Sequence, residues 1–463
     1  MNKSDLKCLL VVVPFIPVEL PCIGFPYIAS ALKVKGYDVK IEDLNLKINN
    51  LNCEHMSYMD NDLNQMKFYD QYLDYFLDWI DSSVIKPGIN VIGFTVWASN
   101  FNIIKKLSQL IKQKNKDIII ICGGPGHSEL YKAVSKDIID IIVKGEGEKA
   151  IVEIFDSLVS EKPLDGIKSI ISINNRGEFI ESFEQEEIED INTIAFPDFT
   201  DLNLFEYELQ EIPLMFSRGC SWRCKFCTVC YQWNKFRTRT ADNIFQEITA
   251  RLQQYKRCEY KFQLYDCACN QNMTVLSQLC DKIIKLNLPY NKVTFVANAK
   301  VIPEMDYDFL KKMKMAGFVM LRLGIESGSD RVLKLMAKPF KSSEASDLLQ
   351  NMFKIGITSV ITIIVGFPGE TEEDWDDTVE FLRKNSQYVS VIFLNFCSIT
   401  HETASTRFKD IIDLNYEDPN YWNSKDMKNT YEIRKARLIK LDKVLSQTSI
   451  KIVEPMRHYS NIP

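Results

Sequence analysis

The stretch that decides the fold is Ser217-Arg218-Gly219-Cys220-Ser221-Trp222-Arg223-Cys224-Lys225-Phe226-Cys227. Its three cysteines have the spacing C-x3-C-x2-C and directly follow a short apolar run, residues 212–216, which predicts a β-strand. Thiolates are the usual ligands of iron–sulfur clusters, and ferredoxin-type sequences supply four cysteines per cluster. Because only three cysteines lie close together in this stretch, a cluster bound by them would leave one iron open to a small molecule.

The loop taken alone leaves two other interpretations open. Cys230 follows Cys227 at a further x2 spacing, so the loop also fits a four-thiolate zinc site. The grouping can also arise by chance, because the chain has 13 cysteines. The spacing therefore favours an iron–sulfur cluster without excluding zinc.

Length and composition set the class of protein. A chain of 463 residues predicts two or three domains, and its 46% hydrophobic and 25% charged residues are typical of a soluble globular protein. The net charge of −6 argues against a general nucleic-acid binder. The longest apolar run, residues 8–18, is too short to span a bilayer and lacks a cleavage site after it. We therefore expect a cytoplasmic protein without a disulfide framework and without a membrane partner.

The order of apolar and amphipathic segments predicts an α/β fold. In residues 1–160, continuous apolar strands alternate with helices, which predicts a Rossmann-like domain with a parallel sheet covered on both faces. Residues 206–410 repeat the pattern six times, which predicts a partial (β/α)6 TIM-type barrel whose active site lies at the carboxyl ends of the strands. Residues 161–205 are expected to connect the two, with an extra strand at 165–174 and a turn at 176–178. Residues 411–463 are expected to form a helical tail.

Two further stretches of the second domain strengthen the cluster interpretation. Gly324-Ile325-Glu326-Ser327-Gly328 follows its fourth predicted strand, and Gly366-Phe367-Pro368-Gly369-Glu370 follows its fifth. Together with Cys220, Cys224 and Cys227, they resemble the motifs of the radical S-adenosylmethionine (SAM) superfamily. The resemblance implies a [4Fe–4S] cluster on the three cysteines and SAM on its open iron, with Cys230 a bystander. It also implies SAM contacts from Phe226, Asp266, Asn298, Lys300, Arg322, Glu326, Gly366 and Pro368.

The second domain departs from this family at one motif. The family's glycine-glycine-glutamate loop is replaced by Leu264-Tyr265-Asp266-Cys267-Ala268-Cys269-Asn270, in which Asp266 is the candidate acidic partner of the methionine amino group. Cys267 and Cys269 are candidate extra ligands, although buried spectator thiols are the favoured interpretation.

The first domain is similar to the cobalamin-binding domains that precede many radical SAM proteins. The similarity rests on four loops: Gly24-Phe25-Pro26-Tyr27, residues 95–99, Gly123-Gly124-Pro125 and Gly145-Glu146-Gly147-Glu148. It implies cobalamin contacts from Thr95, Trp97, Ser99, Gly123, Gly124, Gly145 and Glu146. Residues 14–24 lack the histidine that ligates cobalt in other cobalamin domains, so Trp97 is a candidate cover for the lower cobalt face. A core or domain-interface tryptophan is the alternative.

Both resemblances together imply a class B radical SAM methyltransferase-like enzyme. Such an enzyme cleaves SAM to a 5′-deoxyadenosyl radical, abstracts hydrogen from a small-molecule or peptide substrate, and transfers a methyl group from methylcobalamin to an unactivated carbon. It needs an electron donor such as a reductase, a flavodoxin or a ferredoxin. Cyclisation or rearrangement, loss of cobalamin binding, and a zinc- or cluster-bearing protein without catalysis are the alternatives.

Overall fold

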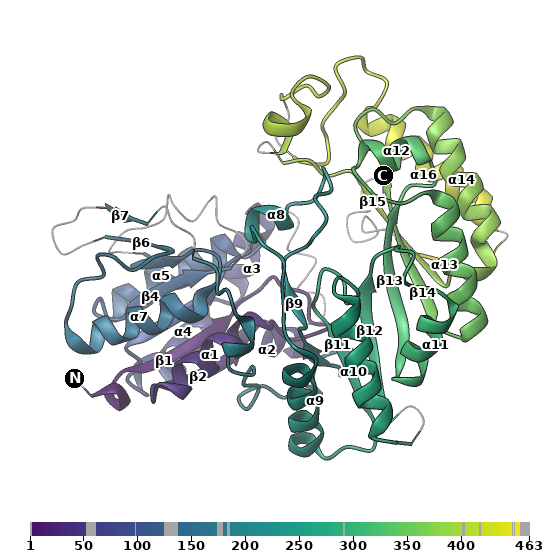
Figure 1. Cartoon of the computed structure of the whole chain (residues 1–463). Coiled ribbons are helices and arrows are strands. Elements are labelled where there is room, and N and C mark those ends of the chain that lie inside the picture. The colour runs from purple at the N-terminus through teal and green to yellow at the C-terminus, as the bar shows by residue number, and fades with distance from the viewer. Residues whose placement is uncertain are drawn as a thin grey trace. The chain divides into compact units, whose positions relative to one another are not determined.

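The chain folds into two compact units, residues Met1–Pro213 and Leu214–Pro463 (Figure 1). The structure is a computed structural model that describes residues 2–51, 62–97, 99–124, 138–173, 179–182, 186–289, 292–400, 403–415, 418–446, 448 and 450–453. The boundaries predicted at residues 160, 205 and 410 stay predictions. None of the helices within these ranges has both the length and the apolar surface to cross a bilayer.

The first unit is built on a seven-stranded sheet in the order β2-β1-β3-β4-β5-β6-β7. The five predicted strands are confirmed and run parallel, whereas the last two strands pair antiparallel. Because the order reverses between β1 and β3, a ligand of this sheet is expected at the carboxyl ends of those two strands. The strands are β1 Lys7–Val12, β2 Asp38–Asp43, β3 Val91–Thr95, β4 Ile119–Gly123, β5 Ile141–Val143, β6 Ile170–Ile173 and β7 Phe179–Glu181.

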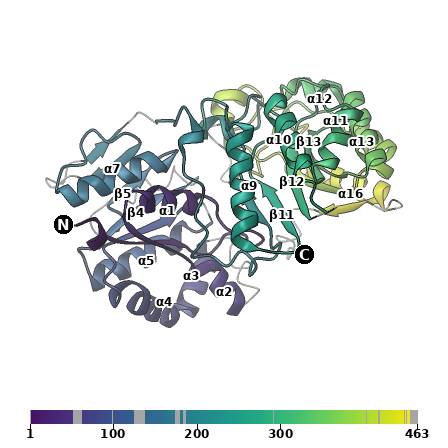
Figure 2. The same ribbon diagram turned by 60° about the horizontal axis from the view of Figure 1, so that its bottom comes forward.

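Two apolar cores cover the two faces of this sheet. Successive residues of β1 point to opposite faces, so Leu9 and Val11 join one core and Leu10 and Val12 join the other. Helices α1 and α7 lie on one face, and α2 to α5 lie on the other (Figure 2). The bounds are α1 Gly24–Val34, α2 Leu44–Leu51, α3 Asp62–Gln71, α4 Leu73–Trp79, a π-helix Ile80–Ile85, α5 Phe101–Lys114 and α7 Gly147–Ser160, with short 3-10 turns at Lys3–Asp5 and Ile191–Thr193.

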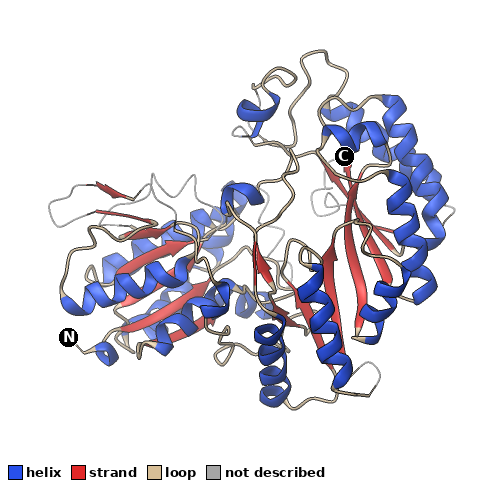
Figure 3. Cartoon of the chain, in the orientation of Figure 1, coloured by secondary structure: helices blue, strands red, loops and turns tan. Residues whose placement is uncertain are grey.

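The second unit has a seven-stranded parallel sheet in the order β16-β15-β14-β13-β12-β11-β8. Its sequential order and β-branched strands are those of an open barrel, and Figure 3 shows helices covering one face of the curved sheet. All six predicted strands are confirmed. The strands are β8 Ile212–Leu214, β11 Tyr260–Leu264, β12 Val293–Ala299, β13 Phe318–Glu326, β14 Thr358–Val365, β15 Val391–Phe396 and β16 Lys451–Val453.

Helix starts in this unit follow the capping residues of the sequence. The side chains of Thr240, Asn272, Asp306, Thr371 and Thr430 each accept a hydrogen bond from a first-turn N–H. The bounds are α8 Val229–Gln232, α9 Ala241–Tyr255, α10 Met273–Lys285, α11 Tyr307–Met315, α12 Asp330–Leu335, α13 Ser342–Ile355, α14 Glu372–Asn385 and α16 Tyr431–Leu445, with a 3-10 turn at Ser386–Tyr388 and a π-helix at Ala404–Phe408.

Three features differ from the sequence-based expectation. The tail is not helical throughout, because Lys451–Val453 adds strand β16 to the edge of the sheet beside β15. The extra strand expected at 165–174 is confirmed only as β6, and the turn expected at 176–178 lies outside the described residues. The short strands β9, Ser217–Arg218, and β10, Arg237–Thr238, were not expected at all.

Candidate active site

The cysteine loop is closed at its base by a two-stranded clasp. Strands β9 and β10 pair antiparallel, with Arg237 opposite Arg218 and Thr238 opposite Ser217. The end of the loop is therefore hydrogen-bonded to its beginning. Gly219, which follows β9, has φ +80°, and a Cβ atom there would lie 2.4 Å from the Lys235 carbonyl oxygen. Only glycine satisfies both conditions, so this residue permits the loop to close.

The three cysteine thiols are electrostatic neighbours on this loop. Cys224 is 8% exposed, and Cys220 and Cys227 are partly buried. Burial raises the pKa of Cys224, the nearby Lys338 cation lowers it, and Cys227 and Cys220 raise it further. The Arg407 guanidinium donates to the carbonyl oxygens of Cys224 at 3.3 Å, Lys225 at 2.7 Å and Cys227 at 3.3 Å. The Arg407 cation, from the π-helix Ala404–Phe408, thus fixes the loop's shape.

The three thiols of this loop are candidate ligands of an iron–sulfur cluster. Within the described ranges, no three histidine, cysteine or carboxylate side chains converge closely enough to hold one metal ion. A zinc site requires its thiolates to meet at one atom. In a [4Fe–4S] cluster each thiolate binds a different iron, so three thiols from one loop are suitable ligands. The side chain of Cys230 lies outside the described residues.

Two buried lysines flank the loop at Trp222. Lys300 lies 4.8 Å and Lys338 5.6 Å from the centroid of the indole ring. Burial lowers the pKa of Lys300, and the thiols of Cys220 and Cys224 oppose that shift. Sequence reasoning listed Lys300 but missed Lys338 and Arg407. No motif marks these two residues, because only the fold brings them to the loop.

Asp266 lies beneath the loop. Its side chain is 1% exposed, and it accepts hydrogen bonds from the Phe216 N–H at 2.8 Å and from the Ser217 hydroxyl. Burial raises its pKa to about 6, although these hydrogen bonds oppose the rise. The carboxylate therefore orients the segment that enters the cysteine loop, and its role toward methionine stays a prediction.

Cys267 and Cys269, in the loop after β11, have different surroundings. Burial, together with the neighbouring Cys220 and Cys227, raises the pKa of Cys267 to about 12, which places this thiol near the cluster cysteines. Cys269 is fully buried, and its charged neighbour is Asp266 rather than any cysteine of the loop. These positions support the spectator interpretation for Cys269.

Glu326 occupies a strained position at the end of β13. Its φ is +71°, and the pairing of β13 with β14 shifts register between Gly324 and Glu326. Burial raises the pKa of its carboxyl, whereas Lys338, whose Nζ lies 3.6 Å from Glu326 Oε1, lowers it. A Cβ atom on Gly324 would lie 2.6 Å from the same Oε1. The bulge therefore turns the carboxylate back over its own strand.

Two other residues that are predicted to contact SAM, Asn298 of β12 and Arg322 of β13, are hydrogen-bonded to residues of β11 and of the loop that follows it. The Asn298 side chain donates to the Asp266 carbonyl oxygen at 2.9 Å, and Arg322 donates to the Gln263 side chain at 3.0 Å. Phe226 packs against an apolar cluster that includes Ile364 and Phe367. The site therefore combines contacts from several strands.

The glycine turn after β14 faces the tail. A Cβ atom on Gly366 would lie 2.1 Å from Arg434 Cδ, and the Asn429 side chain donates to the Gly366 and Phe367 carbonyl oxygens at 3.1 Å. Pro368 is buried in this turn. The space beside Gly366 that was expected to face SAM is thus occupied by Arg434 of α16, and a SAM contact through this turn stays a prediction.

Gly328, in the segment after Glu326, is also packed against the protein itself. Helix α14 occupies the space in which a side chain would lie, because a Cβ atom on Gly328 would be 2.5 Å from Phe381 Cβ and 2.8 Å from Thr378 Cα. The glycine is therefore needed for helix packing at the end of β13.

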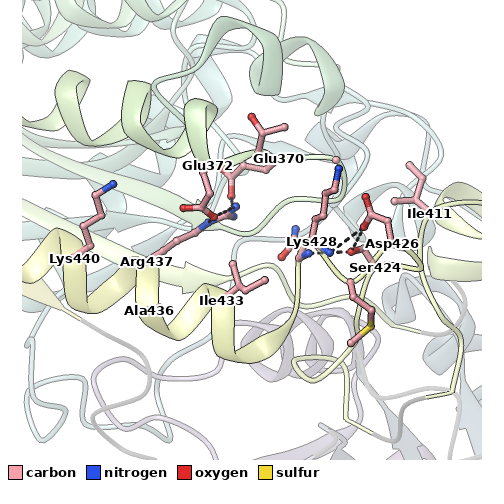
Figure 4. Close-up of a pocket in the computed structure, with 14 residues that line it drawn as sticks. Glu370, Glu372, Ile411, Ser424, Asp426, Lys428, Ile433, Ala436, Arg437 and Lys440 are labelled. Atoms are coloured by element: carbon pink, nitrogen blue, oxygen red, sulfur yellow. Dashed lines mark hydrogen bonds and ion pairs between the residues drawn. The ribbon is translucent and has the colours of Figure 1, made fainter.

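A cavity of about 760 Å³ lies beside the turn after β14. Figure 4 shows Arg437 of α16 bound to Glu370 and Glu372 on one side, and Ser424 and Asp426 on the other. Arg437 and Glu370 are both buried and lie 2.7 Å apart. Burial raises the pKa of Glu370 to about 7, and Arg437 opposes that rise.

In the first unit, the loops after β1 and β3 are tied together at the switch point. The Ser99 hydroxyl donates to the Phe15 carbonyl oxygen at 2.7 Å. The buried Asn100 side chain accepts from the Trp97 N–H at 2.9 Å and donates to the Thr95 carbonyl oxygen at 3.1 Å. Trp97 itself is 42% exposed, so within its own unit it is not a core residue.

The loop after β4 packs directly on this loop. A Cβ atom on Gly124, whose φ is +118°, would lie 2.7 Å from the Val96 carbonyl oxygen, and the Val96 N–H donates to Gly123 at 2.7 Å. Gly145 also has a positive φ, +66°, after β5. The Glu146 carboxylate is buried and accepts from the Ile188 N–H at 2.7 Å, so it holds the connector.

Comparison with known protein families matches both units. A model of the B12 binding domain matches residues 10–155, and a model of the radical SAM superfamily matches residues 214–382. The chain joins a B12-binding domain to a radical SAM domain. A [4Fe–4S] cluster, SAM and cobalamin are therefore its cofactors.

Curated relatives of this B12-binding radical SAM protein are distant. An uncharacterized methyltransferase from Pyrococcus horikoshii is 24% identical over 301 residues, which cover 64% of each chain. An anaerobic magnesium-protoporphyrin IX monomethyl ester cyclase from Rubrivivax gelatinosus is 25% identical over 313 residues, 65% of this chain and 55% of the relative. The chain thus spans less than two thirds of the length of either relative.

A solved structure shares the fold of this B12-binding radical SAM protein. The radical SAM methyltransferase TsrM from Kitasatospora setae, bound to tryptophan and a SAM analogue, matches with a TM-score of 0.67 at 16% identity. The match covers 94% of this chain and 89% of TsrM. At this identity the likeness concerns the fold.

Proposed function

We propose that the chain is a cobalamin-dependent radical SAM enzyme that methylates an unactivated carbon of a small-molecule or peptide substrate. The observation that carries the proposal is the clasped loop with three neighbouring thiols at the carboxyl end of β8, in a chain whose other unit is a B12-binding domain. When bound, the cofactors supply radical formation from SAM and a transferable methyl group.

The chain's own residues hold and shield these groups. Cys220, Cys224 and Cys227 hold the cluster, and Arg407 keeps the loop in shape. Glu326 presents its carboxyl group to the ribose hydroxyls, with Lys338 opposing the rise in its pKa that burial causes.

In the first unit, the backbone around Thr95, Ser99, Gly123, Gly124 and Gly145 cradles the corrinoid. When cobalamin is bound, the exposed Trp97 indole would be the candidate cover for the lower cobalt face, because residues 14–24 offer no histidine ligand. Glu146 also holds the connector through its bond with the Ile188 N–H, and we propose that it lies beside the bound corrinoid.

A second candidate function is radical cyclisation or rearrangement without methyl transfer. Its support is the 25% identity to a cyclase over 313 residues. In both cases we propose that a reductase, flavodoxin or ferredoxin delivers the electron.

The test is anoxic incubation of the reconstituted protein with SAM, hydroxocobalamin and dithionite. We expect 5′-deoxyadenosine together with S-adenosylhomocysteine, and we expect Cys224→Ala to reduce both to background. Cys258→Ala, which removes an exposed cysteine outside the loop, is the control and should retain both products. 5′-Deoxyadenosine alone would favour cyclisation, and neither product from the wild-type protein would refute the enzyme assignment.

A further inference from the structure

Lys300 is a buried cation without a carboxylate partner. It follows β12, is 7% exposed, and its Nζ donates to the Ser221 hydroxyl at 2.6 Å and to Gln271 Oε1 at 2.8 Å. It also contacts the Cys220 side chain and, at 4.8 Å, the face of the Trp222 ring. Over the described ranges of the chain, no carboxylate oxygen lies within 4.0 Å of this ammonium group.

Two other lysines with buried side chains, Lys338 and Lys112, are paired with carboxylates. Lys338 lies 3.6 Å from Glu326, and Lys112 lies 2.8 Å from Asp140. A buried ammonium group without a negative partner is costly, so such groups are normally paired. The sulfur groups that interact with Lys300 are the side chains of Cys220, Cys224 and Cys267, and the first two carry negative charge when they bind a cluster as thiolates.

The position of Lys300 is built into the fold. Asn270 holds its backbone at both ends, accepting from the Lys300 N–H at 2.8 Å and donating to its carbonyl oxygen at 2.9 Å. Gln271, which accepts from the ammonium group, also accepts from the Ser221 N–H at 2.9 Å and donates to the Gly219 carbonyl oxygen at 3.1 Å. The same glutamine thus links the lysine to the start of the cysteine loop.

We infer that Lys300 is the counter-cation of the cluster, a positioning residue that favours the cluster's reduced state. The inference rests on the proposed function, because it requires a cluster on the three cysteines. In the redox step, dithionite gives one electron to the 2+ cluster and yields the 1+ cluster, while Lys300 keeps its proton and no bond forms or breaks. Since reduction adds negative charge, a fixed buried cation stabilises the product more than the reactant and raises the reduction potential.

The test is a redox titration of reconstituted protein without SAM, followed by electron paramagnetic resonance of the reduced cluster. Lys300→Met removes the charge and keeps most of the length, whereas Lys300→Arg keeps the charge. Lys312→Met is the matched control, because Lys312 is a partly buried lysine of the same unit that pairs with Asp281 on the neighbouring helix α10. At a fixed solution potential, we expect Lys300→Met to hold at least tenfold less reduced cluster than the wild type. This corresponds to a fall in the cluster's reduction potential of about 59 mV for a one-electron couple. Lys300→Arg and Lys312→Met should match the wild type.

The outcomes separate this inference from the proposed function. A wild-type protein that binds no iron or sulfide would refute the proposed function itself. A loaded Lys300→Met protein with an unchanged potential would overturn the inference, and weaker SAM binding at that unchanged potential would assign Lys300 to the methionine carboxylate instead. If Lys300→Met fails to load a cluster, loading of Lys300→Arg supports the charge requirement, whereas failure of both variants overturns it.

Discussion

At the residue scale, three glycines of the site lie where other protein atoms occupy the space that a side chain would need. Gly219 lies against the Lys235 carbonyl oxygen, Gly324 against the Glu326 carboxylate, and Gly366 against Arg434. The contacts at Gly219 and Gly366 join segments that are distant in sequence, and the contact at Gly324 lets the Glu326 side chain fold back over its own strand. These glycines are therefore required by packing within the site, in addition to any ligand that approaches them.

The first prediction concerns Gly219. We expect Gly219→Ala to open the clasp, because the added Cβ would lie 2.4 Å from a carbonyl oxygen in addition to the left-handed strain at φ +80°. Gly356→Ala is the control, since Gly356 has φ +78° and nothing within 4 Å of the added Cβ, and it should lose only about 1–2 kcal/mol of stability. The measurement is iron content after reconstitution together with urea denaturation. Full iron loading of Gly219→Ala would contradict this account.

At the element scale, α14 shows how local and tertiary contacts are combined at a helix start. The Thr371 hydroxyl accepts from the Asp374 N–H at 3.3 Å, and the Asp374 carboxylate accepts from the Thr371 N–H at 2.8 Å, which is a capping box. The same carboxylate accepts from the Ser329 hydroxyl at 2.8 Å and from Arg331 Nε at 3.0 Å. The cap therefore also fastens the segment that follows Glu326 in the chain.

The second prediction concerns Asp374. Burial alone would raise its pKa, but the hydrogen bonds from Arg331 and Thr371 prevail and hold the pKa well below its usual range. Because the folded pKa is depressed, the stabilisation is present at neutral pH and is lost as the pH falls below about 4. We expect Asp374→Asn to lose about 1–3 kcal/mol at pH 7 and to approach the wild type in acid, measured by urea denaturation.

Asp376→Asn is the matched control for this prediction. Asp376 lies on the same helix, but its ion pair with Lys440 is exposed on both sides. Its loss should therefore change the free energy of unfolding by less than about 0.5 kcal/mol at either pH. Equal effects of the two substitutions would contradict the role given to the cap.

At the scale of the whole molecule, each unit has its own hydrogen-bond network around its own loops. The loops after β3 and β4 of the first unit are held by Asn100 and the Val96 backbone. The cysteine loop of the second unit is held by Arg407, Gln271 and Asp266. Loading of the two cofactors should therefore be separable.

The third prediction tests this separation. Asn100→Leu keeps the approximate side-chain volume but removes both hydrogen bonds to the loop at 95–100, so we expect retention of hydroxocobalamin after desalting to fall about tenfold. Its iron content should stay at the wild-type level. Cys224→Ala should show the reverse, with iron lost and corrinoid absorbance kept, and loss of both cofactors in either variant would contradict separate loading.

The sequence alone was sufficient for the two α/β units, for the alternation of strands and helices along the chain, and for the cysteine loop. These features depend on local properties, namely apolar runs of β-branched residues, capping residues at helix starts and the spacing of three cysteines in one loop. The family motifs at Glu326 and Gly366 also lie within single short segments. Such signals are complete in the chain before it folds.

Only the tertiary structure decided what surrounds those segments. Lys338 and Arg407 reach the cysteine loop from distant parts of the chain, and strand β16 joins the sheet beside β15 although the tail was expected to be helical. The turn at Gly366 was expected to face a ligand, but α16 fills that space with Arg434. These contacts are set by packing between elements that are far apart in sequence, and no periodicity or motif within one segment carries that information.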